Sequence, residues 1–148
     1  MNWRISDGKW SLLEIVCHLV DEEIEDFRAR VDHCLHRPEA PMTPIDPQGW
    51  VLSRKYSERD YAEMCARWKV ERQQSLQWLN ALHNPDWSSC HHHPKLGEVS
   101  AFFFLANWVE HDYLHMRQIL NLKHHFLAAH CSSGLYYAGE WTSGQNKV

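Results

Sequence analysis

Long apolar runs are scarce in this sequence, and the longest ones, such as AFFFLA at 101–106, fall far short of the roughly 20 residues that a membrane-spanning helix needs. Their length excludes a bilayer span. An excess of basic residues is also lacking, because 15 Lys and Arg stand against 19 Asp and Glu and the net charge is −4. No basic face favours phosphate binding, so nucleic acid is not an expected partner.

Paired cysteines are lacking as well. The five cysteines are odd in number and form no Cys-x-x-Cys pair. The first ten residues, MNWRISDGKW, lack the charged segment and the following apolar segment of a secretory signal. These absences predict a reduced, cytoplasmic protein whose thiols pack as small hydrophobic groups.

The strict alternation of apolar and polar residues that is typical of a strand is absent, as are repeats and low-complexity tracts. A chain of 148 residues with 44% hydrophobic content has the size of one domain and can bury a core without disulfides or metal. Apolar residues recur instead at three- and four-residue steps in three long stretches. The sequence therefore predicts one all-α domain over 1–148, a bundle of long helices with a core at about 7–125 and a C-terminal extension at 126–148.

The first predicted helix begins with a capping box, in which Ser11 and Glu14 satisfy each other's backbone N–H groups. Its apolar periodicity runs to Leu35, and the helix should end before Pro38. Residues 37–50 hold four prolines, which predicts a long surface loop.

The second predicted helix follows this loop, with Ser57 as N-cap and Asp60 in the N3 position, and ends at 84–87. A loop rich in histidine comes next. The third helix is predicted from about Glu98 to His125.

His111 and His115 are four residues apart in the third helix, which places them on one face with roughly 5 to 6 Å between Cβ atoms. Twelve histidines give about one such pair by chance, so the spacing alone does not indicate a metal site. The position of the pair on the helix has to be considered as well. At 100° per residue, His115 lies about 40° and Trp108 about 60° from His111, so both imidazoles belong to the apolar stripe. An unpaired buried polar ring costs roughly 1 to 3 kcal/mol. A single core histidine usually finds a hydrogen-bond partner, but a third converging histidine would favour a metal.

His18, near the middle of the first helix, is the candidate for that third histidine. It borders an acidic stripe that includes Glu22, so a carboxylate could fix the tautomer of an inward-facing, neutral imidazole. Glu22 and Glu110 are candidates for such a supporting role or for a general base, although each is more often a solvated helix residue. In the His-rich loop, His93 is a candidate for the mouth of the site, with surface decoration as the alternative.

Three stretches in this order, WSLLEIVCHLVDEE (10–23), HPKLG (93–97) and WVEHDYLHMRQI (108–119), resemble the DinB-like superfamily of small helical metalloproteins. The resemblance covers about residues 7–123. It implies a DinB/YfiT-like up-and-down four-helix bundle that holds a divalent metal through His18, His111 and His115. It also implies zinc, nickel or iron as the metal and, in some branches, thiol-dependent transferase or isomerase activity.

Three neutral histidines leave a divalent metal with an open position, as in catalytic sites. Such a metal could activate water for hydrolysis or bind a thiol. The expectation is a metal-dependent hydrolase or thiol-dependent transferase or isomerase acting on a small molecule; the alternative is a non-catalytic, stress-related protein that binds a metal or small ligand. A zincin peptidase is disfavoured because HDYLH has Asp where HExxH has Glu. Nucleophilic catalysis by Cys17 is disfavoured because His18 points about 100° away.

The chain departs from the family pattern because the first helix of the bundle is absent or shortened. Three long helices do not close a four-helix core. The alternatives are a shortened reading frame, a C-terminal segment (126–141) that covers the gap, or a second copy of the chain. We expect a homodimer, because the aromatic residues exceed what three helices can bury.

Overall fold

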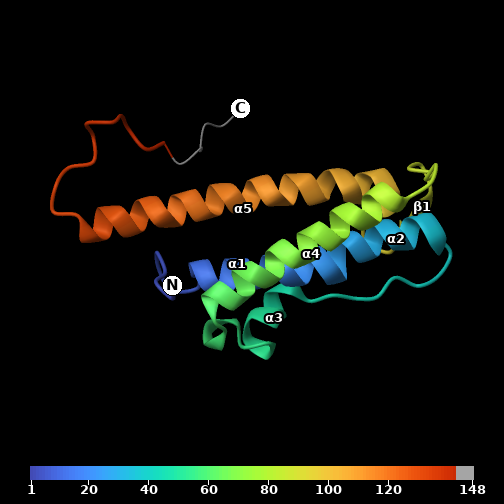
Figure 1. Cartoon of the computed structure of the whole chain (residues 1–148), viewed down its shortest axis with the longest axis horizontal. Coiled ribbons are helices and arrows are strands. Elements are labelled where there is room, and N and C mark those ends of the chain that lie inside the picture. Colours follow the sequence, from blue (N-terminus) through green and yellow to red (C-terminus); the bar gives the residue numbers. More distant parts are fainter. Residues whose placement is uncertain (143–148) are drawn as a thin grey trace.

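Three long helical rods run alongside one another in the computed structural model, which describes residues 1–142 (Figure 1). The first rod consists of α1 (Leu12–Asp21), the π-helical segment η1 (Glu22–Arg28) and α2 (Ala29–His36). The second and third rods are α4 (Tyr61–Ala81) and α5 (Ala101–His130). The smaller elements are α3 (Pro47–Ser53), the 3-10 turn η2 (Tyr56–Glu58), β1 (Cys90–His93) and β2 (Gly97–Ser100). In the described part of the chain, no helix is long and apolar enough to cross a membrane.

The helix starts are set by polar caps. At the start of α1 the Ser11 hydroxyl accepts from the Glu14 backbone N–H and the Glu14 carboxylate accepts from the Ser11 N–H, which confirms the predicted capping box. The prediction of Ser57 as the N-cap of α4 was wrong. Asp60 caps this helix by accepting from the Glu63 N–H at 2.8 Å, while Ser57 lies in the 3-10 turn before it.

The His-rich segment is a β-hairpin, not the predicted loop. Strands β1 and β2 pair antiparallel, with His91 opposite Val99, and both of these side chains are buried. Gly97 closes the turn with a φ of 74°, a left-handed conformation that favours glycine. The hairpin escaped prediction because consecutive histidines show no apolar alternation. Nδ1 of His91 donates to the Pro38 carbonyl at 2.7 Å, so the buried ring has a partner.

Residues 37–46 form a crossover that runs back along the bundle (Figure 1). The predicted loop to residue 50 ends earlier, because Asp46 caps α3 and Pro47 occupies its first turn. The crossover makes the first rod and α4 parallel, whereas the predicted up-and-down order holds between α4 and α5.

The core consists of two apolar clusters along the first rod. One cluster joins α1 to α3, η2 and α4; its buried members include Leu13, Val16, Val20, Trp50, Tyr56 and Met64. The other joins η1 and α2 to β2 and the first turns of α5; it includes Phe27, Val31, Cys34, Val99, Phe104 and Trp108. The first rod is thus the central element of the fold.

The most deeply buried carboxylate of the central rod, Glu23, is paired with an arginine. Glu23, only 1% exposed, accepts two hydrogen bonds from Arg72 of α4 and one from the Trp108 indole of α5. Arg72 also donates to both oxygens of Asp112 on α5, at 2.6 and 2.9 Å. This Glu23–Arg72–Asp112 network therefore joins η1, α4 and α5 at one level of the bundle.

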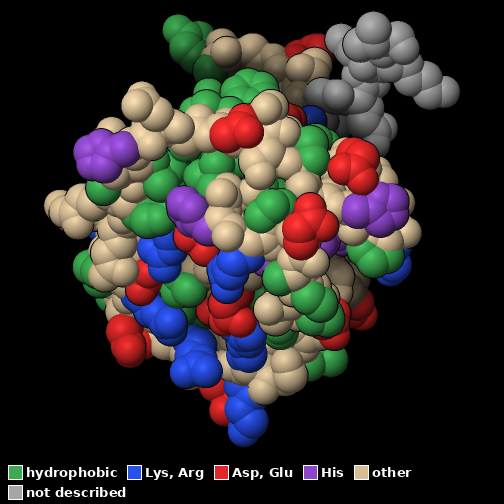
Figure 2. Space-filling view, turned by 90° about the vertical axis from the view of Figure 1, so that its right-hand side faces the viewer, with side chains coloured by type: hydrophobic (Ala, Val, Ile, Leu, Met, Phe, Trp, Pro, Cys, Tyr) green, Lys and Arg blue, Asp and Glu red, His purple; other side chains and the backbone are tan. Residues whose placement is uncertain are grey.

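The outer face of α5 remains largely uncovered by the described residues. Residues 126–130 extend α5 instead of folding back, and beyond them Tyr136 and Tyr137 are 80% and 99% exposed. Trp141 does return to α5, where it stacks on His124. The described residues therefore do not support the alternative in which 126–141 covers the open face of the bundle; residues 143–148 of the predicted extension lie outside the described residues. At the hairpin end of the molecule, Lys and Arg side chains gather in the lower half of the view, with Asp and Glu side chains among them (Figure 2).

Substitution of Arg72 tests the role of the ion network. We expect Arg72→Met to lower the free energy of unfolding by about 3 kcal/mol, because the Glu23 carboxylate is left in a buried position without its cation. Urea denaturation measures the change, and Arg67→Met on an exposed position of α4 is the matched control. Equal stability of the two variants would show that the network does not hold the helices together.

Candidate metal centre

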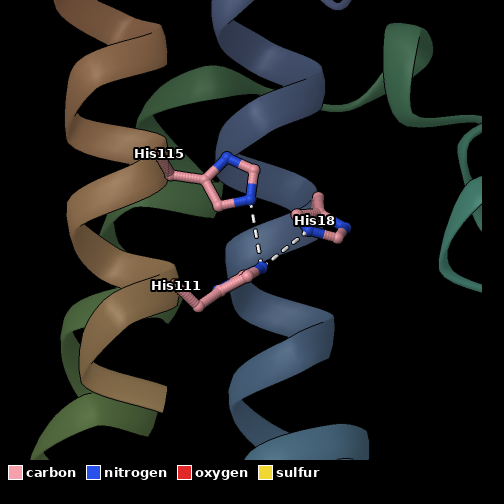
Figure 3. Close-up of side chains that lie close together, drawn as sticks. All are labelled: His18, His111 and His115. Atoms are coloured by element: carbon pink, nitrogen blue, oxygen red, sulfur yellow. Dashed lines mark hydrogen bonds between the residues drawn. The ribbon is translucent and has the colours of Figure 1, made fainter. Parts of the chain in front are cut away.

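Three histidine rings converge in the middle of the bundle, His18 from α1 and His111 and His115 from α5 (Figure 3). Nε2 of His111 lies 3.2 Å from Nε2 of His18 and 3.0 Å from Nε2 of His115. The three potential ligand atoms all lie within 4.8 Å of one another. The structure thus brings together the three histidines that the sequence singled out.

Aromatic rings hold the imidazoles in place. Trp10, just before α1, lies parallel to His115 at a centroid distance of 6.4 Å and against His18 at 4.7 Å. Phe27 of η1 packs against His111 at 4.9 Å. These contacts restrict the rotation of rings that helix geometry alone would leave free.

The hydrogen bonds of the rings indicate their tautomers. Nδ1 of His115 donates to the side-chain carbonyl of Gln118 at 2.7 Å, which leaves a lone pair on Nε2. His111 Nε2 carries at most one proton, so it cannot donate to both neighbouring Nε2 atoms. A cation among the three nitrogens would accept all of their lone pairs at once.

The electrostatic environment keeps the rings neutral. Burial lowers the pKa of His18 to about 3, with further lowering by the nearby His115 and His111. Burial and the His115 ring lower the pKa of His111 to about 4, and burial also lowers the pKa of His115. Neutral imidazole is the form that binds a metal, so little proton release is needed at neutral pH.

Glu22 lies beside His18 as the sequence suggested, but the two side chains are not hydrogen-bonded. Oε1 of Glu22 is 4.0 Å from Nδ1 of His18, and both atoms are buried without a hydrogen-bond partner. Burial raises the pKa of Glu22 to about 9, and a hydrogen bond with Asp26 contributes to the shift. The carboxyl group therefore holds a proton at neutral pH in the metal-free site.

The other two candidates lie apart from this convergence. Glu110 is exposed and makes no hydrogen bond to the three histidines. It lines a separate cavity of about 350 Å³, together with His93 and one side of His111. Nδ1 of His93 accepts from the backbone N–H groups of Lys95 and Leu96, so it supports the hairpin turn.

An open pocket of about 430 Å³ adjoins the three rings. Its other walls come from the N-terminal segment, the first turn of α3, η1 and α5: Gly8, Lys9, Trp10, Pro47, Gln48, Glu22 and Gln118. Sequence reasoning missed most of these residues because the crossover brings distant segments together. Gln118 could have been found, since it is one helical turn after His115.

The family model of the DinB superfamily matches residues 1–119. The chain belongs to the DinB superfamily. A comparison with curated proteins gives no match.

Among solved structures, the chain is similar to YfiT from Bacillus subtilis, described as a probable metal-dependent hydrolase with an unusual four-helix bundle topology. The two share 19% sequence identity and superpose with a TM-score of 0.73 over 84% of this chain and 71% of YfiT. This similarity confirms the predicted DinB/YfiT-like bundle fold.

The two rival enzyme hypotheses find no support in this DinB-superfamily structure. Asp112, which stands where a zincin has its catalytic Glu, is bound by Arg72 and is not free to act as a base. Cys17 is fully buried, and burial raises its pKa to about 11, so it is not a thiolate at neutral pH.

The depressed histidine pKa values predict how the rings contribute to the pH dependence of stability in the metal-free protein. Below the ordinary pKa of 6.5 the unfolded chain binds protons that folded His18 and His111 do not, so these two rings lower stability as the pH drops from 6.5 towards 4. The raised pKa of Glu22 acts in the opposite direction over the same interval, so the contribution of one ring is measured against a variant that lacks it. We expect each ring to cost about 1 kcal/mol at about pH 5.5 relative to about pH 7.5. The stability at the lower pH relative to the higher one should therefore be greater in His18→Leu than in the wild type, as measured by urea denaturation. An identical pH dependence in both proteins would contradict the assignment.

Proposed function

We propose that this chain is a divalent-metal-dependent enzyme of the hydrolase type, with His18, His111 and His115 as metal ligands. The observation that carries the proposal is the convergence of three neutral imidazole nitrogens beside an open pocket. A site closed by protein ligands would favour a structural or sensing role instead.

Two of the three nitrogen–nitrogen separations suit a tetrahedral ion. Metal–nitrogen bonds of about 2.0 to 2.1 Å imply nitrogen–nitrogen separations of roughly 3.3 Å. Two separations of 3.0 and 3.2 Å between Nε2 atoms approach this value. A set of three imidazoles suits zinc or nickel best among the expected metals, and iron is the third choice.

The residues that line the pocket would have different roles around a bound metal. A bound divalent ion supplies Lewis acidity and lowers the pKa of water at its open position. Gln118 orients His115, while Lys9 and Gln48 offer polar groups to a small substrate. Trp10 forms an apolar wall against which an uncharged part of the substrate can pack.

Glu22 holds a proton beside this site. Its carboxyl group borders the pocket, and burial keeps it protonated at neutral pH. If it ionises as a cation enters, Glu22 can accept the Nδ1–H of His18, which would make that ring a stronger ligand. The same open position would also bind the sulfur of a small thiol, as a thiol-dependent transferase or isomerase requires.

Metal titration of single variants tests the proposed ligands. We expect His115→Ala to weaken zinc or nickel binding by more than about 100-fold, beyond the loss typical for a supporting hydrogen bond. His92→Ala should bind like the wild type, because His92 is exposed on the hairpin and bonds to Glu98. Calorimetry on protein purified without a His-affinity resin gives both affinities. Equal effects of the two substitutions would show that other histidines bind the metal.

A further inference from the structure

A second cavity shares the His111 ring with the open pocket beside the three histidines. This hairpin cavity has a volume of about 350 Å³ and lies between η1, α2, the turn of the β-hairpin and the first half of α5. Among the residues that line the two cavities, His111 alone belongs to both. The proposed metal chemistry uses no other residue of the hairpin cavity, so its polar groups need a separate explanation.

Apolar side chains form most of the wall of the hairpin cavity. Phe27, Phe103 and Phe104 contribute rings, and Leu96 and Leu114 complete the wall. Leu96, Phe103 and Leu114 are 59%, 40% and 42% exposed, so the described chain leaves this wall open to solvent. A small concave site with aromatic walls and a few polar groups is typical of small-molecule binding, and this one suits an aromatic ring.

His93 supplies a hydrogen-bond donor at the hairpin turn. Its Nδ1 accepts from the backbone N–H groups of Lys95 and Leu96, both at 3.2 Å, so the proton of the neutral ring lies on Nε2. Within residues 1–142, Nε2 has no hydrogen-bond partner. Burial and the charge of Arg30 lower the pKa of His93, which keeps the ring neutral at neutral pH.

Arg30 of α2 adds a positive charge to the same cavity. Its Nε donates to Asp26, its Nη1 contacts the sulfur of Met42, and its guanidinium group lies over the Phe104 ring at 5.6 Å. Its Nη2 has no hydrogen-bond partner in the part of the chain that the structure describes. Arg30 and His93 thus offer N–H groups to an acceptor such as a carboxylate.

The α5 side of the cavity supplies acceptors instead. The side-chain amide of Asn107 donates to the Phe103 carbonyl at 2.8 Å, which leaves its side-chain oxygen free to accept. Glu110 is exposed and has no ion-pair partner among the described residues. Because Asp26 is already paired with Arg30, the unpaired negative charge of the cavity is that of Glu110. A positively charged group of a ligand would complement it.

We propose that the hairpin cavity binds a free amino acid with an aromatic side chain, in its zwitterionic form. The ligand carboxylate accepts from His93 and Arg30, and the ligand ammonium group donates to Asn107 and Glu110. The aromatic side chain packs against the phenylalanine rings. The proposal does not depend on metal binding, because none of these residues is a proposed metal ligand.

The distribution of charge favours a zwitterion over simpler aromatic ligands. An arylalkanoate without an amino group would satisfy His93 and Arg30 but would bring a second negative charge close to Glu110. An arylalkylamine would satisfy Glu110 and leave the two N–H donors without an acceptor. Both losses should weaken binding, because charge-assisted hydrogen bonds are stronger than neutral ones.

Three ligands that differ only in their charged groups test the proposal. L-Phenylalanine, 3-phenylpropionate and phenethylamine share the ring and the length of the chain. We expect L-phenylalanine to bind the full chain with a dissociation constant of about 1 mM, and each of the other two to bind at least about fivefold more weakly. Amide correlation spectra recorded by NMR during each titration give the affinities, and the largest shifts should occur at His93 and Leu96.

Two variants separate the two charged ends of the ligand. His93→Asn keeps an acceptor for the turn and removes the Nε2–H, so it should weaken L-phenylalanine and 3-phenylpropionate about tenfold and spare phenethylamine. Glu110→Gln should weaken L-phenylalanine and phenethylamine about tenfold and spare 3-phenylpropionate. Glu98→Gln, an exposed substitution on the same hairpin outside the cavity, is the matched control and should bind all three like the wild type.

The same titrations are made on the protein as purified and after metal removal, and the shifts at the hairpin should agree. The amide spectrum of each free variant shows whether its fold is kept. Absence of shifts at the hairpin with all three ligands would overturn the proposal. So would shifts confined to Trp10 and Gln118 or present only with metal, because the ligand would then lie in the open pocket. Equal affinity for the three ligands would contradict the recognition of a zwitterion.

Discussion

The guanidinium group of Arg72 lies between the carboxylates of Glu23 and Asp112, and three helices depend on this arrangement. Glu23 sits in the π-helical segment of the central rod, where the ladder of backbone bonds is widened, and Asp112 directly follows His111 on α5. Removing the cation from a buried carboxylate such as Glu23 costs much more than removing a surface ion pair. The network therefore holds α5 at the height at which its histidines meet His18.

Where the three histidine rings converge, several polar atoms lack adequate hydrogen-bond partners within the protein. Three Nε2 atoms share a space in which they cannot all be paired through protons, and Nδ1 of His18 and Oε1 of Glu22 are buried without partners. Buried polar groups without partners destabilise a fold, so their concentration at one point indicates a site selected for binding. Low histidine pKa values agree with this interpretation, because the rings stay neutral, and so able to bind a cation, over a wide pH range.

Local signals in the sequence predicted much of this DinB-superfamily chain. The Ser11–Glu14 capping box and the periodic apolar residues predicted the first rod, and four-residue spacing predicted that His111 and His115 share a face. Contacts between segments that are distant in the sequence could not be predicted from these local signals. The hairpin has no apolar alternation, and the crossover that brings Pro47 and Gln48 to the pocket depends on tertiary packing. Arg72 acts through contacts whose geometry appears only once the helices are assembled, whereas the contact of Gln118 with His115 lies within α5 and could have been found from their spacing.

The proposed function thus depends on a cation that satisfies three imidazoles and keeps one side open to the pocket. X-ray absorption spectroscopy at the edge of the metal that copurifies with untagged protein tests this most directly. We predict about three imidazole nitrogen ligands at about 2.0 to 2.1 Å, with one further oxygen ligand from water. A metal shell dominated by sulfur, or a shell unchanged when His18, His111 and His115 are replaced together, would contradict the account.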